Sequence, residues 1–459
     1  MYDTLSLLYE LVIQKFPYEP RSPTEDGLLE RLEQAGFAAY AVGGCVRDTL
    51  LGRTPGDWDI TTSARPEQVK AIFGHTIDTG LQHGTVTIMR DKVGYEVTTY
   101  RIDGEYEDGR HPKEVEFTSN LLEDLKRRDF TINAMAYSAE EGLIDPFVGR
   151  DDLAAHLVRA VGEPERRFEE DALRILRLYR FAARFGFAID PATGAAARAL
   201  GPHLDCVSAE RIQEELLKLL AAPRPGSYLE PAVLAVILPE LEPEKQPERF
   251  AELCRTIDRI EPTAENVPAR LAALLCPLGE AGARKALRKL KCSNALTDEV
   301  TALEREAGGG AGSFLLGHES GHSIARPIAC GNRVPPQRTV LGETPGTPNT
   351  TLTVQAKRLL GRYELPTIQR MTALCSARHP EQAVAFAALR AEAEQLTAEN
   401  ACCRVSQLAV NGRDLMAAGV RPGPGLRQVL NALLEAVITG QTPNEKDALL
   451  AAAAQFSAS

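Results

Sequence analysis

The sequence lacks the features that mark secreted and membrane-spanning proteins. Its nine cysteines are scattered, and none forms a Cys-x-x-Cys pair, so neither a zinc knuckle nor a disulfide scaffold is indicated. This cysteine usage favours a reduced, intracellular setting. The N-terminal segment has no basic residues ahead of its apolar ones, unlike a signal peptide. The longest apolar run, residues 232–238, is too short to span a bilayer. We therefore expect a cytoplasmic protein without a membrane segment.

Basic residues are also in short supply. The 459 residues include 52 Lys and Arg against 63 Asp and Glu, which gives a net charge of −11. This balance argues against a protein covered with nucleic-acid-binding residues, so any such partner would need one local basic cleft. Residues 159–184 reverse the balance, because they hold seven Arg and five acidic residues, a net of +2.

The pattern of apolar residues predicts an α+β fold with a β-rich first part and helices after it. Within the first 150 residues, the predicted strands are residues 40–42, 58–61, 85–90, 95–101 and 115–118. The predicted helices are residues 23–35, 66–73, 167–185, 191–200 and 208–220, and further helices follow to about residue 304. Residues 308–350 are rich in Gly, Pro, Ser and Thr and indicate an irregular insertion, after which helical patterns resume.

Two glycines after the first predicted strand, Gly43 and Gly44, begin the strongest local motif. Without side chains, they allow backbone N–H groups to approach a triphosphate, and Arg47 adds a charged donor. Asp57 and Asp59 follow at positions i and i+2, so on a strand both carboxylates would face one side. That placement suits two Mg²⁺ ions roughly 3.5–4 Å apart in a phosphoryl transfer. The alternative is a turn followed by a solvated strand end.

Five segments, in order, resemble the bacterial class II CCA-adding enzymes, within the wider poly(A) polymerase head family. They are GGCVRD, GDWDITT, the run from YRIDGEYEDGRHP to VEF, DLKRRDFTINAMAY and EEDALRILRLYRFAARFGF. The C-terminal run from LAVNGRDLMAAGV to NEKDALL also resembles the family's tail. The resemblance implies a polymerase-β-like nucleotidyltransferase head with Asp57 and Asp59 as catalytic residues and ligands of Mg²⁺. It also implies Gly44 and Arg47 as nucleotide contacts.

The resemblance assigns further roles to the middle segments. Arg128, with Asp129 and Asn133, matches the part of the family that holds the ribose and phosphates. Glu96, on the predicted strand 95–101, is a candidate third carboxylate, and a solvated strand residue is the equal alternative. Residues 101–112 resemble a loop that the family needs for the final adenosine, and they also fit an ordinary mobile loop.

The last of the five segments predicts a helix over residues 169–185 that recognises the nucleotide. The resemblance makes Asp171 and Arg174 the pair that hydrogen-bonds the incoming base, and it makes Arg177 and Arg180 further nucleotide contacts. Steps of three residues turn a helix by about 60°, so these four side chains would form a spiral band. A surface helix with i,i+3 ion pairs is the alternative.

The irregular insertion contains the run His318-Glu319-Ser320-Gly321-His322, which satisfies the HExxH pattern of zinc proteases. Zinc binding by this pattern needs a helix and a third ligand. The neighbouring glycines and serine are poor helix formers, and no third ligand is evident. We interpret this run as a chance match.

Together these patterns predict a head (residues 1–150), a helical neck that recognises the base (151–222), a helical body (223–305), the insertion (306–352) and a helical tail that binds tRNA (353–459). The expected reaction is addition of CMP, CMP and AMP, from CTP and ATP, to the 3′ end of tRNA. A relative with partial activity, which adds only A or only CC or makes poly(A), is the nearest alternative. A catalytically silent RNA-binding protein is a second, against which Asp57 and Asp59 argue. The oligomeric state stays open, and a homodimer is one candidate.

Overall fold

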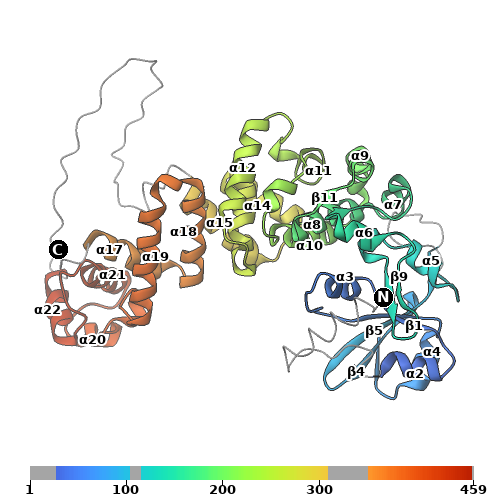
Figure 1. Ribbon diagram of the computed structural model, residues 1–459. Helices are drawn as coiled ribbons and strands as arrows, with labels where there is room; N and C mark the ends of the chain where they lie inside the picture. The colour runs from blue at the N-terminus through green and yellow to red at the C-terminus, as the bar shows by residue number, and fades with distance from the viewer. Residues whose placement is uncertain (1–26, 104–114, 309–349, 457–459) are drawn as a thin grey trace, which may run out of the picture. The chain divides into compact units, whose positions relative to one another are not determined.

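The computed structural model describes residues 27–103, 115–308 and 350–456 (Figure 1). The HExxH run, most of the predicted insertion and most of the loop at residues 101–112 lie outside these described residues. The chain forms two compact units. The first reaches to Asp258 and includes Lys289–Lys291, and the second comprises Arg259–Arg288 and the rest of the chain from Cys292.

A seven-stranded sheet is the centre of the head, with the order β3-β4-β5-β2-β1-β8-β9. In that order the strands are β3 (Thr76–Gly80), β4 (Thr85–Arg90), β5 (Val93–Thr99), β2 (Asp59–Thr62), β1 (Ala39–Val42), β8 (Ala136–Ser138) and β9 (Gly142–Ile144). Neighbouring strands run antiparallel except β2 and β5, which run parallel. The β2–β5 register places Asp59 beside Glu96.

The hairpin β4–β5 shows how the sequence determines a turn and the buried face of a strand in this sheet. Its turn residues Asp91 and Lys92 have φ values of 49° and 68°, the left-handed backbone that a two-residue hairpin turn requires. Along β5, Tyr95 and Val97 are buried while Glu96 is exposed, as the period of two predicts.

Two details of the predicted strands were wrong. Residues 95–101 do not form one strand, because β5 ends at Thr99 and β6 (Arg101–Asp103) pairs with β7 (Val115–Phe117) in a separate sheet. The short strands β3, β8 and β9 were not predicted.

The head also contains five short helices: α2 (Leu28–Gln34), α3 (Gly44–Leu50), α4 (Pro66–Ile72), α5 (Leu121–Lys126) and α6 (Gly149–Ala154). Helices α2 and α4 pack against each other, α2 also against β1, and α4 also against β4 and β5 (Figure 1). A core of Tyr40, Val42, Tyr100, Leu125 and Ala136 joins α5 to the strands. The first turn of α3 follows closely on β1, an interior strand of the sheet, so its backbone is held by the core of the head.

Helices build most of the remainder of the first unit: α7 (Pro164–Glu170), α8 (Leu173–Phe185), α9 (Pro191–Ala199), α10 (Ala209–Leu220), α11 (Pro231–Ile237) and α12 (Pro247–Arg259). Two short strands, β10 (Leu157–Val158) and β11 (Ala188–Ile189), also pair there in parallel. Helix α8 packs against α10 and ends at Gly186, whose φ of 71° suits glycine. The uninterrupted helix predicted from residue 167 to 185 was wrong, since α7 and α8 are separated by Asp171 and Ala172.

The second unit is helical throughout its described part. Its helices are α13 (Val267–Leu275), α14 (Gly279–Lys289), α15 (Asn294–Gly308), α17 (Thr350–Arg362), α18 (Leu365–Arg378), α19 (Ala383–Ala398), α20 (Gly412–Ala417), α21 (Pro424–Ile438) and α22 (Lys446–Phe456). Arg270 is fully buried here, and its guanidinium donates to the carbonyl of Ile260. Among the described helices, none is both long enough and apolar enough to cross a bilayer.

The α+β head followed by helices confirms the predicted fold class. The finer division into head, neck, body, insertion and tail stays a prediction.

Helix α6 offers a test of how the head is packed. A Cβ on Gly149 would lie 2.3 Å from the carbonyl oxygen of Thr131, which belongs to backbone and has little room to move. We expect Gly149→Ala to lower the free energy of unfolding by about 1–3 kcal/mol in urea denaturation. Gly201→Ala is the control, because its Cβ would meet nothing closer than 3.9 Å. Equal stability of the two variants would contradict this packing.

Candidate functional site

A cavity of about 510 Å³ in the first unit collects most of the residues singled out by the sequence. Its lining residues are Gly43, Gly44, Arg47, Asp57, Asp59, Arg127, Arg128, Asp129, Asn133, Asp171, Leu173, Arg174, Arg177, Arg180, Phe181, Arg184 and Arg211. Eight of these are Arg and four are Asp, which gives a formal charge of +4 in a chain of net charge −11. The local basic cleft expected from composition is therefore present.

The turn between β1 and α3 forms one wall of the cavity. Gly43 has φ 78°, which favours glycine, and it precedes the first residue of α3. Arg47, one helical turn later, is almost fully buried, and its guanidinium donates to Asp48 Oδ1 at 2.8 Å and to the side-chain oxygen of Asn133. Arg47 is thus held at the cavity wall by two acceptors.

Asp57 and Asp59 line the same cavity, although not for the reason predicted. Strand β2 begins only at Asp59, so Asp57 precedes the strand and the alternation argument for one shared face was wrong. Burial and the negative charges of Asp57 and Glu96 raise the pKa of Asp59 to about 6, although Arg128 opposes the shift. Two further acidic residues, Asp57 and Glu96, therefore lie near the Asp59 carboxylate at this end of β2.

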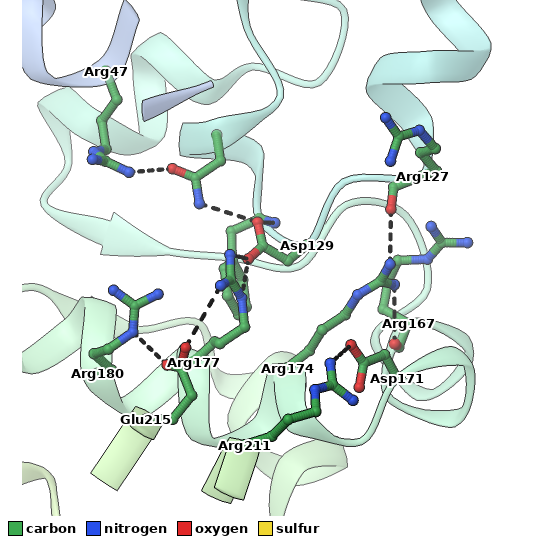
Figure 2. Close-up of polar contacts among 12 residues, drawn as sticks. Arg47, Arg127, Asp129, Arg167, Asp171, Arg174, Arg177, Arg180, Arg211 and Glu215 are labelled. Carbon is green, nitrogen blue, oxygen red and sulfur yellow. Dashed lines mark hydrogen bonds and ion pairs between the residues drawn. The ribbon is translucent and has the colours of Figure 1, made fainter. Parts of the chain in front are cut away.

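A buried carboxylate, Asp129, links the head to helix α8 (Figure 2). Its Oδ2 accepts hydrogen bonds from Arg177 Nε at 2.8 Å and Nη2 at 2.6 Å. Its Oδ1 accepts one from Asn133 Nδ2 at 3.0 Å. Burial alone would raise the pKa of Asp129, but Arg177 and Asn133 outweigh burial and hold this pKa well below its usual range. Asp129 is therefore a fixed anion.

The same network extends along α8 to α10. Arg177 lies 3.7 Å from Glu215 Oε1, and Arg180 donates from Nε to the other oxygen of this carboxylate (Figure 2). Glu215 is itself buried. Arg177 and Arg180 are thus positioned by acidic partners from two other segments, and both line the cavity.

The break between α7 and α8 positions Arg174. Because α7 ends at Glu170, the carbonyl of Arg167 is one of the last four of that helix, which lack a partner within the helix. Arg174 Nη1 donates to this carbonyl at 3.1 Å and to Glu170 Oε2 at 2.8 Å, and its Nη2 donates to the carbonyl of Arg127 at 2.9 Å. Three of its five N–H donors are therefore fixed by the protein.

Asp171 lies in the break itself, with φ −145° and ψ 102°. Its Oδ1 accepts the backbone N–H of Leu173 at 3.1 Å, and its Oδ2 accepts Arg211 Nη2 at 2.8 Å (Figure 2). The prediction that four side chains form a spiral band along one helix was wrong for Asp171, because this residue is not helical. Asp171 and Arg174 nevertheless line one cavity.

Arg128 lies close to the turn at Gly43. Its Nη2 is 3.4 Å from Asp124 Oδ2, and its Nη1 would lie 2.9 Å from a Cβ placed on Gly43. Every residue predicted for nucleotide binding therefore lines the cavity. Three arginines of the cavity were not predicted as site residues from the sequence: Arg127, Arg184 and Arg211. The charge pattern pointed to Arg184, as one of the seven arginines in residues 159–184, whereas Arg211 lies 40 residues from Asp171 and gave no signal.

Comparison with known proteins identifies the family. The CCA-adding enzyme of Geobacillus stearothermophilus is 36% identical over 437 residues, which are 93% of this chain and 95% of that one. The chain belongs to the CCA-adding enzyme family. The CCA-adding enzyme of Limosilactobacillus fermentum gives the same result, at 35% identity over 452 residues, 96% of this chain and 97% of that one. The resemblance found in the sequence is thereby confirmed.

Structural comparison agrees with this membership. The crystal structure of the Bacillus stearothermophilus CCA-adding enzyme in complex with CTP has a TM-score of 0.72 and 32% identity, and the match covers 95% of this chain and 98% of that one. The Thermotoga maritima CCA-adding enzyme complexed with tRNA has the same fold, with a TM-score of 0.65 at 20% identity, over 98% of each chain.

Family models match three parts of the chain. Residues 39–159 match the Poly A polymerase head domain, and these residues include the turn at Gly43 and both predicted metal ligands. Residues 186–245 match the "Probable RNA and SrmB- binding site of polymerase A". Residues 357–453 match the tRNA nucleotidyltransferase domain 2 model. The regions between these matches include α7 and α8, which carry much of the cavity.

The turn at Gly43 allows a test with a matched control. Gly43→Ala would strain a left-handed residue and push against Arg128, whereas Gly52→Ala would strain a similar backbone, φ 67°, with nothing within 4 Å of its Cβ. We expect both variants to lose about 1 kcal/mol or slightly more of unfolding free energy. Only Gly43→Ala should also bind nucleotide more weakly, by about tenfold or more in titration calorimetry. Equal nucleotide affinities in the two variants would contradict the role of this turn.

Proposed function

We propose that this protein adds C, C and A to the 3′ end of tRNA, using CTP and ATP and releasing pyrophosphate, without a nucleic-acid template. The observation that carries the proposal is the single cavity that combines Asp57 and Asp59 with eight arginines, in a chain that belongs to the CCA-adding enzymes over almost its whole length. In the reaction, the 3′-hydroxyl oxygen of tRNA bonds to the α-phosphorus of the nucleotide. The bond between this phosphorus and the bridging oxygen breaks, and pyrophosphate leaves.

The charge of the cavity supports a triphosphate as the ligand. A nucleoside triphosphate carries about four negative charges at neutral pH, since its last phosphate oxygen has a pKa near 6. The lining residues carry a formal +4. Arg47 and Arg128 lie beside the turn at Gly43, where backbone N–H groups can also meet phosphate oxygens. We assign the triphosphate to this end of the cavity.

Enzymes of this family depend on a divalent metal ion, and we propose Mg²⁺. The described residues contain no group of three or more His, Cys, Asp or Glu side chains arranged as a complete metal site. Asp57 and Asp59 fit the usual alternative, in which one or two carboxylates hold Mg²⁺ together with substrate phosphates. The negative charges of Asp57 and Glu96 near Asp59 also favour a cation there. When bound, the metal supplies activation of the attacking hydroxyl and stabilisation of the leaving pyrophosphate.

Base choice is assigned to Asp171 and Arg174. Cytosine and adenine both present an amine donor beside a ring-nitrogen acceptor. Asp171 can accept from the amine, and the two donors that Arg174 does not use in the described contacts can meet the ring nitrogen. Uracil and guanine present a carbonyl oxygen beside a ring N–H, which would oppose both side chains. Arg177 and Arg180 complete the proposed set of nucleotide contacts.

The proposal includes tRNA as the partner and the cytoplasm as the location. A direct assay uses tRNA transcripts that end at the discriminator base, at C and at CC, each incubated with a single NTP. Addition of C, C and A in order supports the proposal. Addition of only C or only A would identify a partial relative, and binding of tRNA without any addition would identify an RNA-binding protein.

The metal ligands provide the first test of mechanism. We expect Asp57→Asn and Asp59→Asn each to lower single-turnover nucleotide addition by about a thousandfold or more, because each removes a charge that holds the metal. The affinity for tRNA should change by no more than about twofold, since it depends on distributed phosphate contacts. Glu67→Gln removes an exposed charge on α4 and serves as the control. Normal addition by either aspartate variant would refute the assignment. A matching loss in Glu96→Gln would make Glu96 the third ligand.

The base-recognition pair provides the second test. Asp171→Ala should lower the use of CTP and ATP and raise the relative incorporation of UTP or GTP. The preference for CTP over UTP should fall by about a hundredfold, because the variant loses the acceptor that pairs with the amine of cytosine. The measurement is addition of one nucleotide to tRNA lacking CCA, with the four NTPs at equal concentration. Unchanged selectivity would show that the base is recognised elsewhere.

A further inference from the structure

Arg211, in the first turn of α10, lines the cavity although no pattern in the sequence pointed to it. Its Nη2 donates to Asp171 Oδ2 at 2.8 Å across 40 residues of sequence (Figure 2). Asp171 lies in the extended link between two helices, so the backbone of a helix does not hold it in place. Its carboxylate is instead fixed at both oxygens, by Arg211 and by the N–H of Leu173.

The number of hydrogen bonds decides whether Arg211 assists Asp171 or blocks it. A carboxylate has two oxygens with about four acceptor positions. The described contacts of Asp171 use two of these, one on each oxygen. Asp171 can therefore accept an amine from a base without losing Arg211, and the pair does not need to open when a nucleotide binds.

The other end of the guanidinium provides a second, independent observation. Arg211 Nη1 is buried and has no hydrogen-bond partner in the described part of the chain. Buried donors usually have a partner, because an unpaired one loses its hydration without compensation. The two terminal nitrogens of this guanidinium therefore differ. Nη2 donates to Asp171, whereas Nη1 is a donor without a partner in a residue that lines the cavity.

We infer that Arg211 is a positioning residue for base selection, which holds the Asp171 carboxylate in the orientation that accepts the amine of cytosine or adenine. This inference rests on the proposed function. The base-recognising part of the cavity then consists of three side chains. Arg174 is fixed by the end of α7 and the carbonyl of Arg127, and Asp171 is fixed by α10 through Arg211.

The test compares selectivity in Arg211→Met, Arg211→Lys and a control, Arg198→Met. Arg198 is an arginine of α9 whose ion pair, with Glu230 at 3.8 Å, lies outside the cavity. The readout is kcat/KM for CTP divided by that for UTP. We expect Arg211→Met to lower this ratio by about tenfold or more, and Arg198→Met to leave it unchanged. Arg211→Lys, which keeps the charge, should recover part of the loss.

A double variant separates positioning from a general structural role. If Arg211 acts through Asp171, the selectivity of Arg211→Met with Asp171→Ala should equal that of Asp171→Ala alone. Independent, multiplying losses would overturn the inference. An equal loss of kcat/KM for all four NTPs in Arg211→Met, with the ratio unchanged, would also overturn it.

The unsubstituted protein distinguishes failure of the inference about Arg211 from failure of the proposed function. If the unsubstituted protein adds no nucleotide to tRNA, the proposed function fails. If it adds C and A selectively and Arg211→Met remains equally selective, only the inference about Arg211 fails. Should Arg211→Met not fold, as judged by its thermal unfolding, Arg211→Lys decides. An unchanged ratio in Arg211→Lys would overturn the inference, and so would a ratio in its double variant with Asp171→Ala that falls below that of Asp171→Ala alone.

Discussion

The ion pair between Asp129 and Arg177 is the interaction on which the rest of the cavity depends. Asp129 follows α5 in the head, and Arg177 lies in the middle of α8, so the two hydrogen bonds between them join the head to the helices that follow. Asp129 is buried, and an ionised carboxylate there is stable only because Arg177 and Asn133 bind it. Loss of Arg177 would leave a buried negative charge without its cation.

The network around this pair solves a problem of like charges. Eight arginines around one cavity repel one another unless anions or aromatic rings lie between them. Glu215 lies between Arg177 and Arg180. The rings of Phe181 and Phe185 are stacked, and arginines lie over both of them, including Arg180 at 4.0 Å from the Phe181 ring centre. The cavity can thus hold a formal +4 in an acidic protein before any phosphate binds.

The sequence predicted which residues line this cavity better than it predicted the contacts that hold them. Motif residues such as Asp59 and Arg47 lie within short segments whose spacing is visible in the sequence, and the strands and turn that carry them are local structures. Arg211 contacts Asp171 only through the packing of α10 against α8, and no local pattern records such a contact. The argument that Asp57 and Asp59 share one face of a strand failed for a related reason, because strand ends depend on pairing with neighbours.

The break between α7 and α8 was the least predictable element, and the two residues proposed to recognise the base depend on it. Residues 167–185 have helical apolar spacing throughout, so local propensity favours one helix. In one helix the carbonyl of Arg167 would accept the N–H of Asp171, four residues later. The break instead leaves that carbonyl for Arg174, and it leaves the Asp171 carboxylate to Leu173 and Arg211. A continuous helix would retain both residue types at the same spacing but would lack the contacts that fix their side chains. Under the proposed function, base selection therefore depends on the interrupted backbone as well as on the two residue types, because the break supplies the contacts that hold both side chains in place.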